Sequence, residues 1–247
     1  MNNEVRTLGH ILQACEGVGC VPEKYWVSLV EAIARRDQLA LHAVCMRTIP
    51  VVFPWVLRRA ASRASAEEAT VEVFQDVWRR AFAYDPAAGT VLGWILNLAR
   101  TRMIHRPRLS GAPETPAAMV LPSRLWKRLA RRIAAQTGLE VVVSPYQAPE
   151  AEWEEVAPGI FCTLLTRDAD LDRVAMLVRL APGIEYPAHT HAGVEELYML
   201  EGELTVDDRN LAAGDYLRSE PGSSDRHVSS RMGCSGVLIT STGDVLI

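Results

Sequence analysis

The stretch Gly183-Ile-Glu-Tyr-Pro-Ala-His-Thr-His-Ala-Gly-Val-Glu-Glu-Leu-Tyr-Met-Leu-Glu-Gly202 decides the fold of the second half of the chain. Side chains alternate between the faces of a strand, so His189 and His191 project from one face toward one point. Glu195 can supply a third metal ligand and His227 a fourth, and imidazole suits zinc, copper, iron or nickel. The alternative is a set of surface histidines on an ordinary hairpin. Because the combined spacing of Gly, His-x-His, Glu and Gly is far more restrictive than a lone histidine, we predict a metal site.

These residues also carry a family resemblance. Gly, five residues, His-x-His, three residues, Glu, six residues and Gly is the first cupin motif, and residues 183–202 match it at every fixed position. Gly214, Pro221-Gly222 and His227 follow in the order of the second motif. Among cupins, the chain looks most like the zinc-binding half of ChrR-type anti-sigma factors, through Leu-Ala-Pro-Gly (180–183), Glu-Glu-Leu-Tyr (195–198), Leu-Glu-Gly-Glu-Leu (200–204) and Ala-Gly-Asp-Tyr (213–216).

The pattern after Gly138 is typical of strands. Short β-rich runs are divided by Pro-Gly, Asp-Asp and Ala-Gly turns, and they comprise Val141 to Val143, Ile160 to Leu165, Val174 to Leu180, Leu197 to Leu200 and Val237 to Thr240. Many short strands at regular spacing favour a double-stranded β-helix barrel over residues 138–247. We therefore expect a C-terminal all-β cupin domain that holds its metal in the mouth of the barrel.

The expected ligand set leaves the identity of the metal open. Three histidines and a glutamate satisfy a tetrahedral zinc completely, whereas a catalytic zinc usually keeps a water. Iron or manganese in the same set could take five or six ligands and retain open positions. Zinc is the predicted cofactor, with iron or manganese as the alternative, and the choice separates a sensor from an enzyme.

Charge divides the chain at the same place. Residues 1–137 contain 19 Lys and Arg against 11 Asp and Glu, net +8, and residues 138–247 contain 7 against 19, net −12. Such asymmetry suggests that one part of the chain faces an acidic partner and the other does not. Two domains of ordinary size fit within 247 residues, each able to bury a core.

Residues 25–108 are predicted to form a small all-α domain. Apolar residues recur there at intervals of three and four. Ser65, followed by two glutamates, is expected to cap one helix, and Tyr84-Asp-Pro-Ala-Ala-Gly89 to end it. A last helix begins at Val91 and carries several arginines toward its end.

Three strings in this domain resemble region 2 of extracytoplasmic-function sigma factors. They are Ala66-Glu-Glu-Ala-Thr-Val-Glu-Val-Phe-Gln-Asp-Val-Trp78, Tyr84-Asp-Pro-Ala-Ala-Gly89 and Gly93-Trp-Ile-Leu-Asn-Leu-Ala-Arg100. The resemblance implies that the first helix docks on the clamp helices of RNA polymerase core and that the second reads and melts the promoter −10 element. It places Glu68, Glu72 and Asp76 on the polymerase side, and Trp94, Arg100, Arg102 and Arg106 near DNA.

Each of these assignments has a purely structural alternative. The arginines could neutralise a few phosphates, but basic helix ends are also common as solvated surface. Trp94 could be a core anchor, since aromatic residues at helical spacing are usually buried. Glu68, Glu72 and Asp76 could form an exposed acidic face beside neighbouring arginines.

The remaining segments are expected to connect and extend these domains. Residues 109–137 form a linker rich in proline that ends in a basic amphipathic helix, predicted to pack one domain on the other. Residues 1–24 form an N-terminal extension with a short apolar helix at best. The five cysteines contain no Cys-x-x-Cys pair, which favours a reducing cytosol over a disulfide framework. No apolar run approaches the length of roughly 20 residues that spans a bilayer, so we expect a cytoplasmic protein without membrane association.

The order of the two resemblances predicts a transcription regulator, in which the region 2-like domain binds polymerase core or promoter DNA and the metal-loaded cupin modulates that binding. The competing hypothesis is a cupin enzyme, such as an iron or manganese dioxygenase, with a helical domain for homodimer formation. It is motivated by Val71, Thr101 and His105, which depart from the usual residues of region 2, and by a cupin in place of a region 4 helix-turn-helix. A third hypothesis is a decoy that binds an anti-sigma factor and releases a sigma factor elsewhere.

Overall fold

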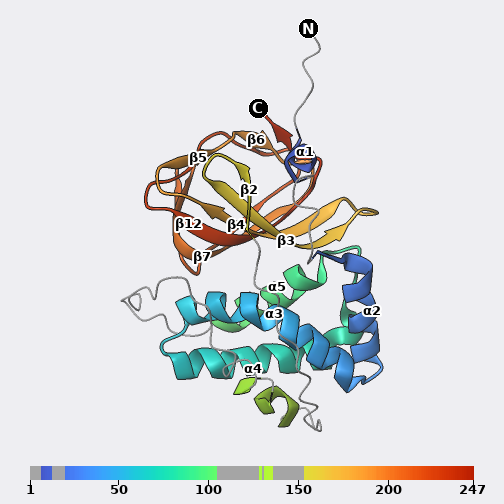
Figure 1. Ribbon diagram of the computed structural model, residues 1–247. Helices are drawn as coiled ribbons and strands as arrows, with labels where there is room; N and C mark the ends of the chain where they lie inside the picture. The colour runs from blue at the N-terminus through green and yellow to red at the C-terminus, as the bar shows by residue number, and fades with distance from the viewer. Residues whose placement is uncertain (1–6, 13–19, 105–127, 130, 136–152) are drawn as a thin grey trace. The chain divides into compact units, whose positions relative to one another are not determined.

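The computed structural model describes residues 7–12, 20–104, 128–129, 131–135 and 153–247. The chain divides into two compact units, of which one comprises Met1–Glu23 with Glu150–Ile247 and the other Lys24–Pro149. The first unit is built from strands and the second from helices (Figure 1). The predicted fold class, a helical bundle followed by a cupin-like β-barrel, is confirmed. The predicted strand Val141 to Val143 lies outside the described residues.

The helical unit contains α2 (Glu23–Ala34), α3 (Gln38–Arg59), α4 (Arg63–Arg80), the 3-10 helix η2 (Ala81–Ala83) and α5 (Val91–Ile104). Asp37 caps α3 by accepting hydrogen bonds from the amides of Leu39 and Ala40. Ser62 caps α4 by accepting one from the Ser65 amide. The N-cap therefore lies at Ser62, three residues before the expected Ser65. Ser65 instead donates its amide hydrogen to the side chain of the cap.

Helix α3 forms the centre of the helical core. By length and composition it could cross a membrane, since an 18-residue window within Gln38–Arg59 has a mean hydropathy of 1.5. However, 67% of that window is buried inside the protein. Phe53 and Trp55 of α3 are fully buried, as are Phe74 of α4 and Ile95 of α5. The apolarity of α3 thus serves packing between helices.

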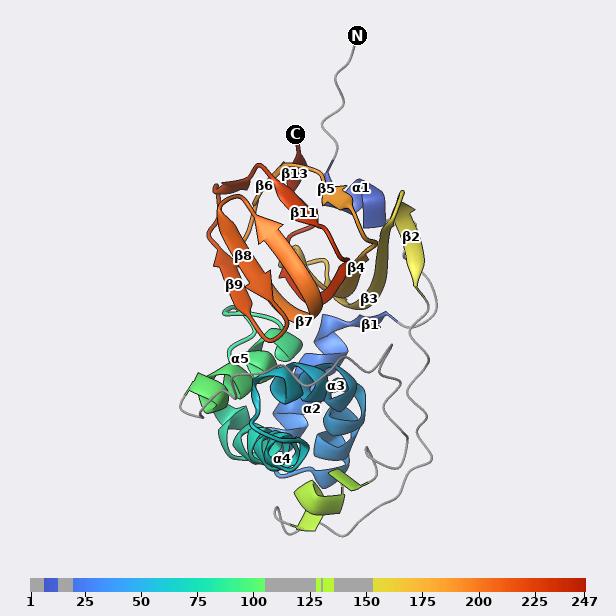
Figure 2. The same cartoon turned by 90° about the vertical axis from the view of Figure 1, so that its left-hand side faces the viewer.

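The strands of the other unit curl around a shared apolar interior (Figures 1 and 2). They are β1 (Val21–Pro22), β2 (Glu154–Ala157), β3 (Ile160–Asp168), β4 (Arg173–Leu180), β5 (Ile184–Tyr186), β6 (His189–Thr190), β7 (Glu195–Val206), β8 (Arg209–Ala212), β9 (Tyr216–Ser219), β10 (Ser224–Asp225), β11 (Val228–Ser230), β12 (Cys234–Thr240) and β13 (Val245–Leu246). One sheet runs in the order β1-β3-β4-β12-β7-β11-β5, with β2 on β3 and with β8 and β9 on β7. A smaller sheet has the order β10-β6-β13.

Strand β12 holds the centre of the large sheet because it pairs antiparallel with β4 on one side and β7 on the other. The last glycine of the first cupin motif lies inside β7, where the backbone of another segment comes close. Gly202 has φ +74, and a Cβ there would lie 2.0 Å from the carbonyl oxygen of Gly233. This position therefore excludes every residue with a side chain.

The described part of the N-terminal extension belongs to the barrel unit. Helix α1 (Leu8–Leu12) buries Leu8 and Leu12 in the same apolar cluster as the strand side chains. Strand β1 adds in parallel to β3, pairing Val21 with Thr166. The barrel unit is thus assembled from both sides of the helical unit in the sequence.

Candidate metal centre

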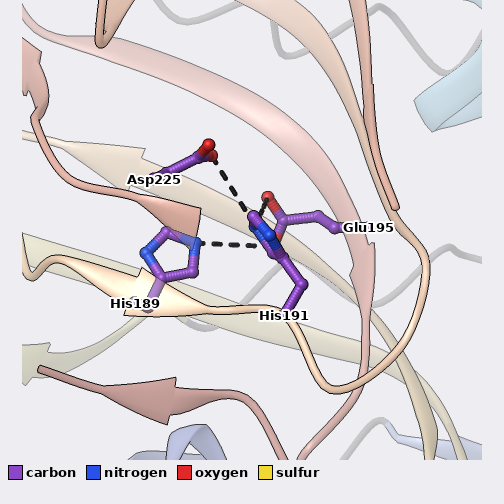
Figure 3. Close-up of side chains that lie close together, drawn as sticks. All are labelled: His189, His191, Glu195 and Asp225. Atoms are coloured by element: carbon purple, nitrogen blue, oxygen red, sulfur yellow. Dashed lines mark ion pairs between the residues drawn. The ribbon is translucent and has the colours of Figure 1, made fainter. Parts of the chain in front are cut away.

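Four buried side chains converge at one end of the barrel: His189, His191, Glu195 and Asp225 (Figure 3). One potential ligand atom from each lies within 4.8 Å of the others. His189 begins β6 and Glu195 begins β7, while Asp225 ends β10. The register between β10 and β6 pairs Asp225 with His189, which brings the second carboxylate beside the histidine strand.

Backbone carbonyls orient both imidazoles. His189 Nδ1 lies 3.0 Å from the Pro187 oxygen, and His191 Nδ1 lies 3.0 Å from the Ser223 oxygen. A carbonyl oxygen can only accept, so each Nδ1 carries the proton and each Nε2 presents a lone pair. Metal-ligating histidines commonly use this outer hydrogen bond to set the tautomer and the orientation of the ring.

The Nε2 atoms face the two carboxylates. His191 Nε2 lies 3.5 Å from Glu195 Oε1 and 3.6 Å from Asp225 Oδ2, and His189 Nε2 lies 3.9 Å from Glu195 Oε2. The Nε2 atom of His191 is buried without a hydrogen-bond partner. A buried polar atom of this kind is costly unless something binds it. A metal ion at the centre would satisfy it, so the donor set fits a metal.

The electrostatics of the cluster point the same way. Burial alone lowers the pKa of His191, but the carboxylate of Glu195, 3.5 Å from Nε2, and the charge of Asp225 raise that pKa above its usual value of 6.5. Burial raises the pKa of Asp225, and the charge of Glu195 adds to that rise. Without a cation the site therefore retains protons, because two carboxylates share a confined, poorly solvated space. A divalent ion would displace these protons.

Asp244 holds the loop that carries His191. Its Oδ1 accepts a hydrogen bond of 2.7 Å from the Ala192 amide, and its Oδ2 accepts one from the Thr240 hydroxyl. Strand β13, which follows Asp244 directly, pairs Leu246 with His189. Strand β13 and Asp244 thus fix the backbone at or next to both histidines.

The structure does not bring His227 into the cluster. Its side chain is exposed, with Nε2 3.2 Å from the Ser229 hydroxyl. Asp207 accepts hydrogen bonds from the amides of Arg226 and His227, which fixes this turn between β10 and β11. Because β10 ends at Asp225, the residue that pairs with the histidine strand is the aspartate, and His227 follows on the turn.

Reasoning from the sequence missed Asp225. The available signal was an acidic residue two positions before His227, in a segment whose spacing departs from that of the second cupin motif. Residues two apart would share a face in a continuous strand, so the pattern could not decide between them. Two imidazoles and two carboxylates form a more oxygen-rich set than expected, one that suits zinc, iron or manganese.

In the helical unit, residues predicted to bind polymerase and DNA contact one another. Arg102 of α5 donates to Asp76 of α4, with both nitrogen to oxygen distances at 2.6 Å, and lies 3.5 Å from Glu72. Asp76 is buried and Glu72 is half-buried, whereas Glu68 is exposed. These contacts join α4 to α5.

The other predicted DNA-binding residues lie along α5 or beyond it. Trp94 is half-buried, with its ring centroid 5.2 Å from that of Tyr84. Arg100 is half-buried and its Nε lies 3.3 Å from Asn97 Oδ1. Arg106 lies outside the described residues.

A basic segment of the predicted linker helix packs within the helical unit. Residues 128–129 and 131–135 are helical, and Leu129 and Ile133 are fully buried. Arg128 forms an ion pair with Glu67 of α4, and Arg132 Nη1 lies 3.7 Å from Glu67 Oε2. Both cartoon views show this segment beside α4 (Figures 1 and 2). Glu67 is consequently buried, next to the exposed Glu68.

Comparison with known proteins confirms the two resemblances. Residues 143–245 match the family model of the ChrR cupin-like domain. The sigma factor SigK of Mycolicibacterium vanbaalenii is 35% identical over 88 residues, covering 36% of this chain and 45% of that protein. The sigma factor RpoE of Cereibacter sphaeroides is 32% identical over 90 residues, covering 36% and 50%. The chain thus spans about half the length of the curated relatives it matches.

Solved structures that resemble this chain include an acetylacetone dioxygenase from Acinetobacter johnsonii, with 18% identity, a TM-score of 0.33, and coverage of 41% of this chain and 72% of that one. KdgF from Halomonas sp. has 21% identity and a TM-score of 0.33, covering 40% and 93%. Identities and scores this low do not transfer an activity to this chain.

Proposed function

We propose that the protein regulates transcription by binding RNA polymerase core or promoter DNA through its helical unit, and that a metal bound by the barrel modulates this binding. The observation that carries the proposal is one chain that joins a sigma-factor-like segment to a ChrR cupin-like domain. The buried cluster of two histidines, a glutamate and an aspartate supports a metal as part of the device.

In this proposal, α4 is the polymerase-binding helix. Glu68 makes the direct contact because it is exposed, while Asp76 and Glu72 hold α5 through Arg102. The DNA contacts come from α5 and the segment after it, with Trp94 and Arg100 as half-exposed groups and Arg106 beyond them. Neutralising phosphates with such residues makes DNA binding dependent on salt.

Zinc is the metal we propose, held by His189, His191, Glu195 and Asp225. With all four residues bound, a tetrahedral zinc is closed to substrate, which suits a sensor or a structural switch. When bound, the metal would supply cross-linking of β6, β7 and β10, and the chain's own carbonyls at Pro187 and Ser223 would orient the ligands.

The test measures association of the full-length protein with RNA polymerase core, and with a single-stranded −10 DNA, at low salt. Zinc-loaded and metal-free protein are compared by biolayer interferometry. We expect binding to core that changes with zinc, and a loss on Glu68→Lys. Glu31→Lys is the matched control, because Glu31 is an exposed acid on α2 of the same unit. Absence of binding to both partners in both metal states would contradict the proposal.

A second candidate is a metal-dependent cupin enzyme, favoured by the second carboxylate in the cluster. A set of two histidines and two carboxylates suits iron or manganese, which accept further ligands. Metal analysis of protein from its native host, combined with oxygen consumption assays, separates the candidates. Stoichiometric zinc without turnover would rule out the enzyme hypothesis, and bound iron or manganese with turnover would support it.

A further inference from the structure

Beside the metal cluster, the barrel contains a small, partly open cavity of about 20 Å³. Its walls are apolar or sulfur-bearing apart from the hydroxyl of one tyrosine, and include Leu8, Leu12, Cys162, Met176, Tyr186 and Leu238. A water molecule needs two to four polar partners, which such walls do not offer. Walls of this kind favour an apolar guest.

One wall of the cavity does not belong to the barrel sheets. Helix α1 contributes Leu8 and Leu12, which lie on one helical face and are 4% and 3% exposed. A helix of five residues is not stable by itself, so α1 persists only through its contacts. Besides the two leucines, these contacts include main-chain hydrogen bonds from Leu8 to the Asp244 oxygen at 2.9 Å and from Gly9 to the Thr242 oxygen at 2.8 Å. Thr7, just before the helix, forms a bridge with Val245. The cover is therefore small and separable.

Two connections lead from this cavity to the metal ligands. Tyr186 lines the cavity, and its ring packs edge-on against His189 with centroids 5.3 Å apart. The backbone oxygen of Asp244 accepts a hydrogen bond from the Leu8 amide. Its carboxylate accepts one from the amide of Ala192, the residue after His191. These contacts connect α1 and the cavity to the neighbourhood of both histidines.

We propose that the cavity is a binding site for a small, uncharged apolar molecule, which takes the place of the Leu8 and Leu12 side chains and releases α1. The residual space holds little more than one water, whereas an apolar cavity of about 150 Å³ accommodates benzene. Vacating two leucine side chains opens space of that order. Charged ligands are excluded because the walls offer no partner for a buried charge. By linkage, the molecule and the metal change each other's affinity by the same factor.

Toluene serves as the probe for zinc-loaded, full-length protein that carries methyl-¹³C methionine. The methyl resonance of Met176, assigned through Met176→Leu, reports the cavity wall, and that of Met232, which is 69% exposed, is the internal control. We expect a saturable shift of the Met176 resonance and none for Met232. No saturable shift in the wild type or in the variants below overturns the proposal.

Variants of α1 test whether it competes with the probe. Leu8→Glu with Leu12→Glu removes the apolar cover, and Gly9→Pro removes the hydrogen bond to Thr242 without placing a charge. If α1 covers the cavity about nine-tenths of the time, both variants bind toluene about tenfold more tightly. The matched control is Leu39→Glu with Leu171→Glu, since both leucines are exposed. Equal affinity in the wild type and the α1 variants overturns the role of α1 as a cover.

A chelator competition measures the coupling to the metal. Zinc should change the toluene affinity of the wild type by some factor, and saturating toluene should change its zinc affinity by the same factor. As a control, the zinc stoichiometry of each variant shows whether its barrel has folded. Toluene binding with an unchanged zinc affinity overturns the coupling.

Discussion

At the scale of single residues, Asp225 is the side chain on which the chemistry of the site depends. Its buried carboxylate lies 3.6 Å from His191 Nε2 and 3.7 Å from Arg209 Nη2. It adds a second negative charge beside Glu195, so a cation at the centre would be held by two carboxylates and two imidazoles. The exposed His227 contributes nothing to this arrangement in the structure.

Removing Asp225 should therefore remove the metal. We expect Asp225→Ala to lower metal affinity by at least about 100-fold. Loss of a residue that only hydrogen-bonds to a metal ligand already costs up to about 100-fold, and Asp225 is proposed as a ligand itself. His227→Ala should bind metal as the wild type does. Metal stoichiometry and competition with a chromophoric chelator measure both. Retention of metal by Asp225→Ala, or its loss in His227→Ala, would contradict the assignment.

The pKa shifts also predict how the metal-free barrel responds to pH. The pKa values of His191, Asp225 and Asp244 are all raised in the folded state, for the carboxyls mainly by burial. At these three groups the folded barrel binds more protons than the unfolded chain, so their contribution to stability falls as pH rises. His42 of the helical unit contributes in the opposite sense, because burial lowers its pKa. The decline begins above the ordinary carboxyl value of 3.8 and extends past 6.5.

Urea unfolding of metal-free protein at several pH values from about 5 to 8 measures this slope. Asp225→Asn removes one of the titrating groups, so it should flatten the decline. A metal-free protein that becomes more stable over this range would show that the cluster does not dominate its pH response.

At the scale of elements, the junction of α4 and α5 depends on the Arg102 to Asp76 pair. Asp76 is buried, so Arg102→Ala leaves its carboxylate with the more distant Arg79, at 3.7 Å, as its ion-pair partner among the described residues. We expect a loss of about 1–3 kcal/mol of unfolding free energy, less than for a fully buried pair because Arg102 is partly exposed. Arg35→Ala, at an exposed position on the same unit, should cost less than about 0.5 kcal/mol. Denaturant unfolding compares the two, and equal effects would contradict this role.

The basic segment next to α4 permits a test that involves the proposed partner. Arg128→Glu with Arg132→Glu breaks two ion pairs of Glu67, next to Glu68, and leaves its pair with Arg63. If α4 docks on polymerase, the carboxylates of Glu67 and Glu68 should then be more available, and binding to core should tighten by roughly threefold or more. This factor corresponds to the free energy of one or two partly exposed ion pairs. Arg131→Glu is the control, since Arg131 is exposed on the same segment and has the same charge change. Weaker or unchanged binding in the double variant would count against α4 as the docking helix.

At the scale of the whole molecule, two units with separate cores share one chain. The barrel takes up strand β1 and helix α1 from before the helical unit, and its remaining strands come after that unit. The four candidate metal ligands all lie in the barrel unit, in or next to β6, β7 and β10.

Removing the metal should therefore destabilise one unit selectively. A ligand at about 100 times its dissociation constant stabilises the folded state by about 2.7 kcal/mol. We expect chelation to accelerate amide hydrogen exchange in peptides that cover β6 and β10, while peptides that cover α3 keep their protection. Mass spectrometry of exchanged peptides measures both, and equal acceleration in α3 would show that the units are not independent in stability.

Much of the fold and part of the site could be predicted from local patterns. Strands such as Val174 to Leu180 and helices such as the one beginning at Val91 follow from periodicity. The N-cap of α4 was misplaced by three residues, because Ser62 and Ser65 both precede acidic residues and only the backbone conformation decides between them. The packing of α1 was not predictable, since its partners lie more than 140 residues away in the sequence.

The sequence by itself determined that His189, His191 and Glu195 share a site, because a strand of fixed period and a short turn bring them together whatever surrounds them. It also determined the helical and β halves, through the periods of their apolar residues. Only the tertiary structure decided that Asp225 rather than His227 completes the cluster, and that Arg102 pairs with Asp76 and Glu72. Those choices depend on where β10 ends against β6 and how α4 meets α5, and contacts between distant segments are set by the packing of the whole chain rather than by local spacing.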